Sequence, residues 1–127
     1  MKRILKLEKL ISKLYFIFLS KDNNIIYPII YMKTYFPYKS DKPDKKYYII
    51  TSNNKKVYSG AAGMSDYTIH KDEERKQRYI NRHKANENWT KSGIDTAGWW
   101  SLQYFWSYPT KEEAYNHIKK DLKKWGI

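Results

Sequence analysis

The spacing of apolar residues predicts a buried helix near the carboxyl end of the chain. Between Ala97 and Ser107 the apolar side chains fall on every face of a helix, and this pattern is typical of a fully packed element. These side chains are Trp99, Trp100, Leu102, Tyr104, Phe105 and Trp106. Asp95 or Thr96 can cap the start of this helix. We expect it to be the central element of the core.

Two further helices are predicted, one after this core element and one before the loop that precedes it. The last one covers Thr110 to Trp125, because Ala114, Ile118 and Leu122 repeat every four residues and share one face. A threonine at its start and a glutamate three residues later form a capping box. In the loop from residue 86 to residue 93, Trp89 is expected to fold back onto the core.

A charged helix is predicted from Lys71 to Lys84. Its acidic residues lie in the first turn and its basic residues in later turns, an order that suits the helix dipole. Only Tyr79, Ile80 and His83 supply an apolar stripe, so we expect this helix to lie mostly on the surface. Its basic side chains either contact phosphates or form a solvated face.

A β-hairpin is predicted from Lys45 to Ser59. Tyrosine and β-branched residues favour strands on both sides of the Ser52–Lys55 turn, which contains two asparagines. Gly60 and Gly63 follow the second strand, and they permit a tight turn or a close approach of the backbone. Between residues 37 and 44 the prolines and polar residues predict a connector. The sequence therefore predicts an α+β fold, a small hairpin or sheet packed against about three helices.

The amino-terminal third has a different pattern. Residues 1–19 carry apolar side chains at helical spacing with lysines on other faces, which predicts a basic amphipathic helix. Such a helix packs on its own domain or lies on a membrane surface. Residues 23–36 favour short extended pieces, one of them an edge strand. Because Met32 is a second candidate start, we expect an appendage over residues 1–31 and a single compact domain over residues 32–127.

The net charge of the chain indicates which class of partner it can bind. Lys and Arg number 25 against 13 Asp and Glu, so the formal net charge is +12. Such an excess favours anionic partners such as nucleic acid, although A/T-rich coding also enriches lysine. There is no cysteine, which excludes disulfides and thiolate metal sites. Neither a signal peptide nor a membrane-spanning segment is predicted.

Candidate catalytic groups are few. Asp66 and His70 lie in the turn before the charged helix and are close enough in sequence to meet, but such pairs usually order a loop. No histidine or carboxylate spacing typical of a metal site is present, and no nucleophile is set against a base. We therefore expect neither a metal nor a cofactor, and an enzyme centred on Asp66 and His70 is an alternative of low weight.

The segment that begins at Gly60 resembles a family of short, basic, uncharacterised proteins encoded by giant DNA viruses, of the mimivirus-like and algal-virus kinds. The resemblance rests on the strings SDYTIHKDEERKQRYINRH and NWTKSGIDTAGWW, and it extends over roughly residues 32–125. Phe is common in that family where this chain has Ser59. The resemblance implies a viral origin and a location in the host cytoplasm (virus factory) or in the virion. It transfers no catalytic residues, because the family has no established activity.

These observations lead to one main hypothesis and two alternatives. The main hypothesis is a non-enzymatic basic protein that is associated with the virion and binds nucleic acid through phosphate contacts, without sequence preference. Its predicted contact residues are Arg75, Arg78, Arg82, Lys84 and Lys91. One alternative is a structural protein that docks on other virion proteins. The other is the small enzyme described above.

Overall fold

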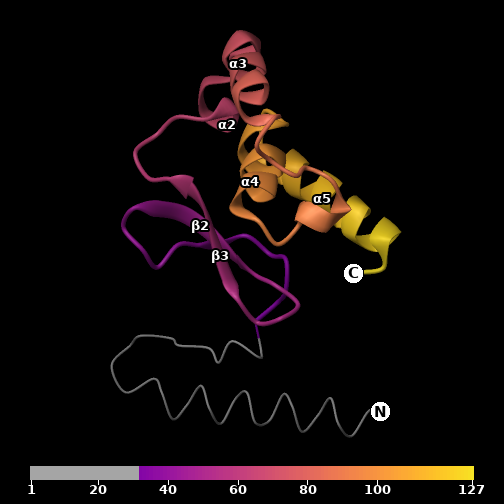
Figure 1. The fold of residues 1–127 in the computed structure, drawn as a ribbon. Helices are drawn as coiled ribbons and strands as arrows, with labels where there is room; N and C mark the ends of the chain where they lie inside the picture. Colours follow the sequence, from indigo (N-terminus) through magenta and orange to yellow (C-terminus); the bar gives the residue numbers. More distant parts are fainter. Residues whose placement is uncertain (1–31) are drawn as a thin grey trace, which may run out of the picture.

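The computed structural model describes residues 32–127. The predicted amphipathic helix of residues 1–19, its membrane contact and most of the extended pieces before residue 36 lie outside the described residues. Figure 1 shows the described part as a twisted β-hairpin on one side and a group of helices on the other. This arrangement confirms the predicted α+β class.

The sheet has three antiparallel strands in the order β1-β2-β3. The strands are β1 (Tyr38–Lys39), β2 (Lys45–Ile50) and β3 (Lys56–Ala61). β2 and β3 confirm the predicted hairpin, with Tyr48 opposite Tyr58. The predicted connector over residues 37–44 is wrong in one respect, because it contains β1. There Tyr38 pairs with Tyr48, and the rings of the two tyrosines stack with centroids 5.6 Å apart.

Helices follow the sheet. They are α2 (Tyr67–His70), α3 (Glu73–His83), η3 (Lys91–Gly93), α4 (Ala97–Trp100), η4 (Ser101–Trp106) and α5 (Lys111–Trp125). The charged helix begins later than predicted, because Lys71 adopts a left-handed conformation that ends α2. Asp72 then caps α3 by accepting a hydrogen bond from the backbone N–H of Glu74 at 3.0 Å.

The central helix is continuous from residue 97 to residue 106, but its hydrogen bonding changes along its length. α4 is a regular α-helix, whereas η4 is a π-helix, and the Ser107 N–H donates to the carbonyl of Leu102 five residues earlier at 2.9 Å. Thr96 is the cap, since its hydroxyl accepts from the Trp99 N–H at 3.2 Å. Asp95 instead accepts a hydrogen bond from the Tyr35 hydroxyl at 2.7 Å.

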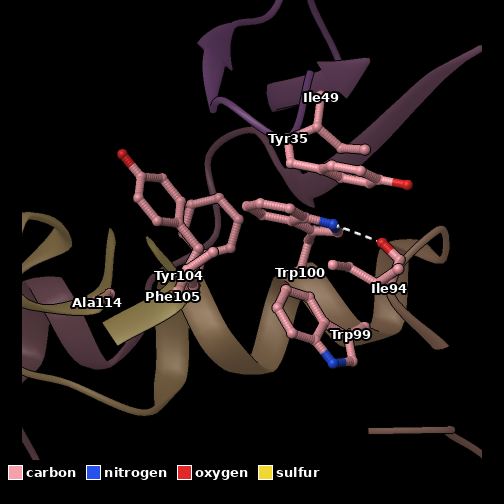
Figure 2. Packing of buried hydrophobic residues seen from close by; sticks show 9 residues of the cluster. Tyr35, Ile49, Ile94, Trp99, Trp100, Tyr104, Phe105 and Ala114 are labelled. Carbon is pink, nitrogen blue, oxygen red and sulfur yellow. Dashed lines mark hydrogen bonds between the residues drawn. The ribbon is translucent and has the colours of Figure 1, made fainter. Parts of the chain in front are cut away.

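The core lies between this helix, the hairpin and α5. Trp99 and Trp100 are 0% and 1% exposed, which confirms the predicted central position of the helix. The Tyr35 ring lies parallel to the Trp100 indole, and Trp100 Nε1 donates to the carbonyl of Ile94 at 2.7 Å (Figure 2). Ala114 and Ile118 bury the predicted stripe of α5 against the same cluster.

The loop before α4 also packs as predicted. Trp89 folds back, and its indole Nε1 donates to the carbonyl of Gly98 at 3.2 Å. On the other side of the central helix, Trp106 packs against Tyr79 of α3 with parallel rings at 4.3 Å. α3 is joined to the rest of the fold through this aromatic contact and through two hydrogen bonds. One runs from Lys76 Nζ to the carbonyl of Ser107 at 2.9 Å, and the other from the Tyr67 hydroxyl to Glu73 at 2.6 Å.

Candidate anion-binding cleft

An open cleft of about 400 Å³ lies where the hairpin, α3 and the central helix meet. We call this space the basic cleft, because its charged lining consists of Lys45, Lys46, Arg82 and Asp66, together with His83. Three permanent cations therefore face one carboxylate. Such a lining attracts anions, and low-dielectric walls concentrate the field of the cations.

A glycine allows the hairpin to pass close to the central helix. Gly60 has a φ of +78°, and a Cβ at this position would lie 2.9 Å from the Phe105 ring. Any larger residue would push β3 away from the helix and widen the gap between them. The expectation of a close backbone approach at this glycine is confirmed. The positive φ of Gly63, +82°, then turns the chain toward α2.

The single carboxylate in the cleft is already paired. Asp66 is 2% exposed, and its Oδ2 lies 2.7 Å from Lys46 Nζ. Its Oδ1 accepts hydrogen bonds from the backbone N–H of Thr68 at 2.9 Å and from the Thr68 hydroxyl. Burial alone raises the pKa of Asp66, but the hydrogen bonds from Lys46 and Thr68 outweigh it and leave the pKa below its usual value. Asp66 therefore stays ionised and holds Lys46 in place.

One wall of the cleft is aromatic. Tyr79 stacks on Trp106 at 4.3 Å with an angle of 5° between the rings, and His83 lies 4.3 Å from Tyr79 on the same helix. Burial, helped by the charge of Glu87, raises the pKa of Tyr79 to about 12 despite a hydrogen bond with Ser101. Tyr79 is therefore neutral and acts as a packed ring at neutral pH.

Three of the predicted contact residues share one side of α3. A helix turns about 100° per residue, so Arg75 and Arg82 lie within about 20° of each other and Arg78 within about 60° of Arg75. All three are exposed, and we call this surface the arginine face. Arg78 lies 4.0 Å from Glu74, but both side chains are mostly exposed, so this ion pair is weak. Arg82 belongs to both the arginine face and the basic cleft.

The other two predicted residues lie elsewhere. Lys84 is about 200° from Arg82 around the helix axis, which places it on another side of α3. Lys91 begins η3 and does not line the cleft. The sequence reasoning did not place Lys45, Lys46 or His83 in such a site. The only available signal for the lysines was that they stand as a pair at the start of β2, the first strand of the hairpin.

The candidate catalytic pair is separated by its hydrogen bonds. Asp66 lines the cleft, whereas His70 does not, and His70 Nδ1 accepts from the backbone N–H of Asp72 at 3.0 Å. The His70 ring packs against Trp106 with centroids 5.3 Å apart. Within residues 32–127, His and acidic side chains form no group of three that could hold a metal ion. The cleft therefore has an excess of positive charge, and its one carboxylate is paired with Lys46 and Thr68.

Comparisons with known proteins find a similarity to one family over part of the chain, and that family has no known activity. Residues 38–83 match a family of unknown function (DUF5754), and this segment runs from β1 to the end of α3. It includes the arginine face and all of the charged lining of the basic cleft. The match supports a relation to an uncharacterised family. No curated protein and no solved structure matches the chain.

Proposed function

We propose that this protein is a non-enzymatic nucleic-acid-binding protein that recognises the phosphate backbone and tolerates any sequence. The observation that carries the proposal is the continuity of the arginine face with the basic cleft. Arg82 joins the two surfaces, and Lys45 and Lys46 extend the positive charge onto the hairpin. Phosphate contacts of this kind supply affinity without sequence information.

The dimensions of the arginine face suit a polyanion. From Arg75 to Arg82 the helix rises about 10 Å, which covers about three nucleotide steps of 3.4 Å. Arginine presents a planar fork of donors that matches phosphate oxygens, and the three guanidinium groups are exposed. No element carries a recognised base-reading motif. Binding through this surface is therefore expected to be sequence-tolerant and strongly dependent on salt.

The proposed context is a large DNA virus, with the protein in the virion or at the site of viral replication, as the sequence resemblance implies. A purely structural role receives less support from the surface. In the described part of the chain, the exposed large apolar residues are Met64, Ile69 and Ile127, the last at the chain end. These side chains do not add up to the extended apolar patch typical of a protein-docking surface. Among residues 32–127, no helix has the length and apolar character that a membrane span requires.

A salt titration of binding tests the proposal. A labelled duplex and a labelled single strand are titrated at several salt concentrations with the parent protein and with an Arg78→Ala, Arg82→Ala double variant. Each lost phosphate contact lowers the slope of log K against log salt by about one, so we expect a decrease of about two. The matched control is Lys84→Ala, Lys91→Ala, which removes the same charge from outside the arginine face. We expect this control to keep most of the slope.

Two results would contradict the proposal. One is the absence of binding to either nucleic acid at low salt. The other is an equal loss of slope in the arginine and lysine double variants, which would show diffuse attraction to a basic surface. In that case a structural role in a larger assembly becomes the better hypothesis.

A further inference from the structure

We propose that the basic cleft holds one unstacked nucleotide of a single-stranded nucleic acid, with its base against the aromatic wall and its phosphate at the cationic rim. This inference rests on the proposed function, but it names a different contact and a preferred form of nucleic acid. The arginine face alone would bind single strands and duplexes alike. The cleft adds a contact that only an unpaired base can make.

The size and lining of the cleft fit one nucleotide. Its volume of about 400 Å³ lies within the usual range of small-molecule sites, roughly 300–1,000 Å³. Among its aromatic residues, Trp106 is only partly buried, so it is the ring that a ligand base can reach. Bases of every kind stack on aromatic side chains, which gives affinity without sequence preference. This tolerance agrees with the absence of a base-reading motif.

The π-helix explains why polar and aromatic groups meet in the cleft. In a regular α-helix, residues five apart such as Ser101 and Trp106 lie about 140° apart around the axis. The wider turn of η4, with its hydrogen bond across five residues, brings them onto the same side, and both line the cleft. Single π turns inside helices are frequent at functional sites. Here the π turn lets Ser101 and Trp106 line the same cleft.

The accessible ring is held in place before any ligand binds, because Trp106 is fixed by its parallel stacking on Tyr79. The Tyr58 ring also lines the cleft, but it is occupied on the hairpin: it lies against Tyr48, and its hydroxyl donates to Asp41 at 2.7 Å. Fixed rings lose little conformational entropy on binding, so more of the stacking energy appears as affinity. The ammonium of Lys42 lies 4.2 Å from the centre of the Tyr58 ring.

The charges at the rim are arranged to take the phosphate. Lys45 and Arg82 are exposed and line the cleft from opposite elements, the hairpin and α3. Lys46 is tied to Asp66 and contributes a fixed charge deeper in the site. A base that stacks inside the cleft therefore leaves its phosphate near two free cations. In a duplex the same base is paired and stacked, so its entry requires the pair to open.

A single charge placed in the cleft tests this inference. Ala97 is exposed and lines the cleft at the first position of α4, so Ala97→Glu puts a carboxylate there. A glutamate in the first turn of a helix suits the helix dipole, so the fold is expected to be retained. The matched control is Asn116→Glu, which makes the same charge change at an exposed position of α5 outside the cleft.

The probes are a labelled 20-nucleotide oligothymidylate and a labelled 20-base-pair duplex at one fixed low salt concentration. We expect Ala97→Glu to weaken single-strand binding about tenfold, comparable to the loss of one base–aromatic stack, with little effect on the duplex. Trp106→Leu should have the same selective effect, and its thermal melting curve shows whether it is folded. Asn116→Glu should change the two affinities equally and only slightly.

The outcomes separate this inference from the proposed function. If Ala97→Glu and Asn116→Glu have equal effects on the single strand, the nucleotide site is overturned while salt-dependent phosphate binding stands. The same conclusion follows if folded Trp106→Leu binds the single strand as the parent does. If neither probe binds at low salt, both the proposed function and this inference fail.

Discussion

Two helices of almost equal length behave in opposite ways in this molecule. The central helix, α4 with η4, buries Trp99, Trp100, Leu102, Tyr104 and Phe105. α3 buries only Tyr79 and exposes the arginine face. In Figure 1 α4 lies among the other elements, whereas α3 projects at the edge of the molecule.

The two helices have different roles: the central helix stabilises the fold, and α3 carries charges of the candidate site. Burial of large rings fixes the position of the central helix, while the stability of α3 depends on its cap, its charge order, the stacking of Tyr79 on Trp106 and the hydrogen bonds of Lys76 and Glu73. The basic cleft forms where the two helices meet, at the stacked rings of Tyr79 and Trp106. A rigid wall and a charged wall are thereby combined in one site.

The largest effect is expected from a cavity in the central helix. Phe105 is 2% exposed and packs against Tyr47, Tyr104 and the backbone at Gly60, so Phe105→Ala should destabilise the protein by about 3–5 kcal/mol. Chemical denaturation monitored by circular dichroism measures this loss. Met64→Ala removes a large but exposed side chain and should change stability by less than about 0.5 kcal/mol. Equal stabilities of the two variants would show that the central helix is not the core.

A smaller loss of stability is expected from a change at the junction of the hairpin and α2. Asp66→Asn removes the charge that pairs with Lys46 and weakens the cap of α2, which should cost about 2 kcal/mol at neutral pH. The pKa of Asp66 is lowered in the folded state, so its contribution is full above the unfolded value of about 4. It is lost as the pH falls through the folded pKa.

The stability difference between parent and Asp66→Asn should therefore be constant above about pH 5 and shrink as the pH falls below about 4. Denaturation at a series of pH values measures it. Asp41→Asn is the control, since Asp41 also has a lowered pKa, mainly through its hydrogen bond with Tyr58, but lies exposed. A difference that grows in acid would show that Asp66 does not stabilise the fold as an anion.

The elements defined by apolar spacing were predictable from the sequence. The hairpin, the central helix and α5 were all expected, because strand-forming residues around a turn, apolar residues on every helix face and an apolar repeat every four residues are each visible in the sequence. The strand β1 was missed, since a strand of two residues directly after Pro37 carries no period. The π-helix was also missed, because the shift to hydrogen bonds across five residues leaves no signal in the sequence.

Only the part of the candidate site that lies on a single helix was predicted from the sequence. Arg75, Arg78 and Arg82 share a helix face, and their sequence spacing alone shows this. Lys45 and Lys46 reach the same cleft from the hairpin, and this proximity depends on the turn at Gly60 and Gly63. Contacts between elements that are distant in the sequence require the tertiary structure, which sequence spacing does not supply.

The prediction with the smallest expected effect concerns whether α3 opens independently of the core, as its small buried surface indicates. Asp72 Oδ1 accepts hydrogen bonds from the N–H groups of Glu74 and Arg75, so Asp72→Ala should cost about 1 kcal/mol. Because α3 buries little, we expect this cost as local opening rather than global unfolding. Hydrogen exchange should become faster at the amides of α3 and stay unchanged in α4 and η4. Asp72→Asn, which keeps the acceptor oxygen and removes the charge, should recover most of the protection. If the amides of both helices exchange faster by the same factor, the two helices unfold as one unit, and the contact between Tyr79 and Trp106 couples them more strongly than a single stacked pair suggests.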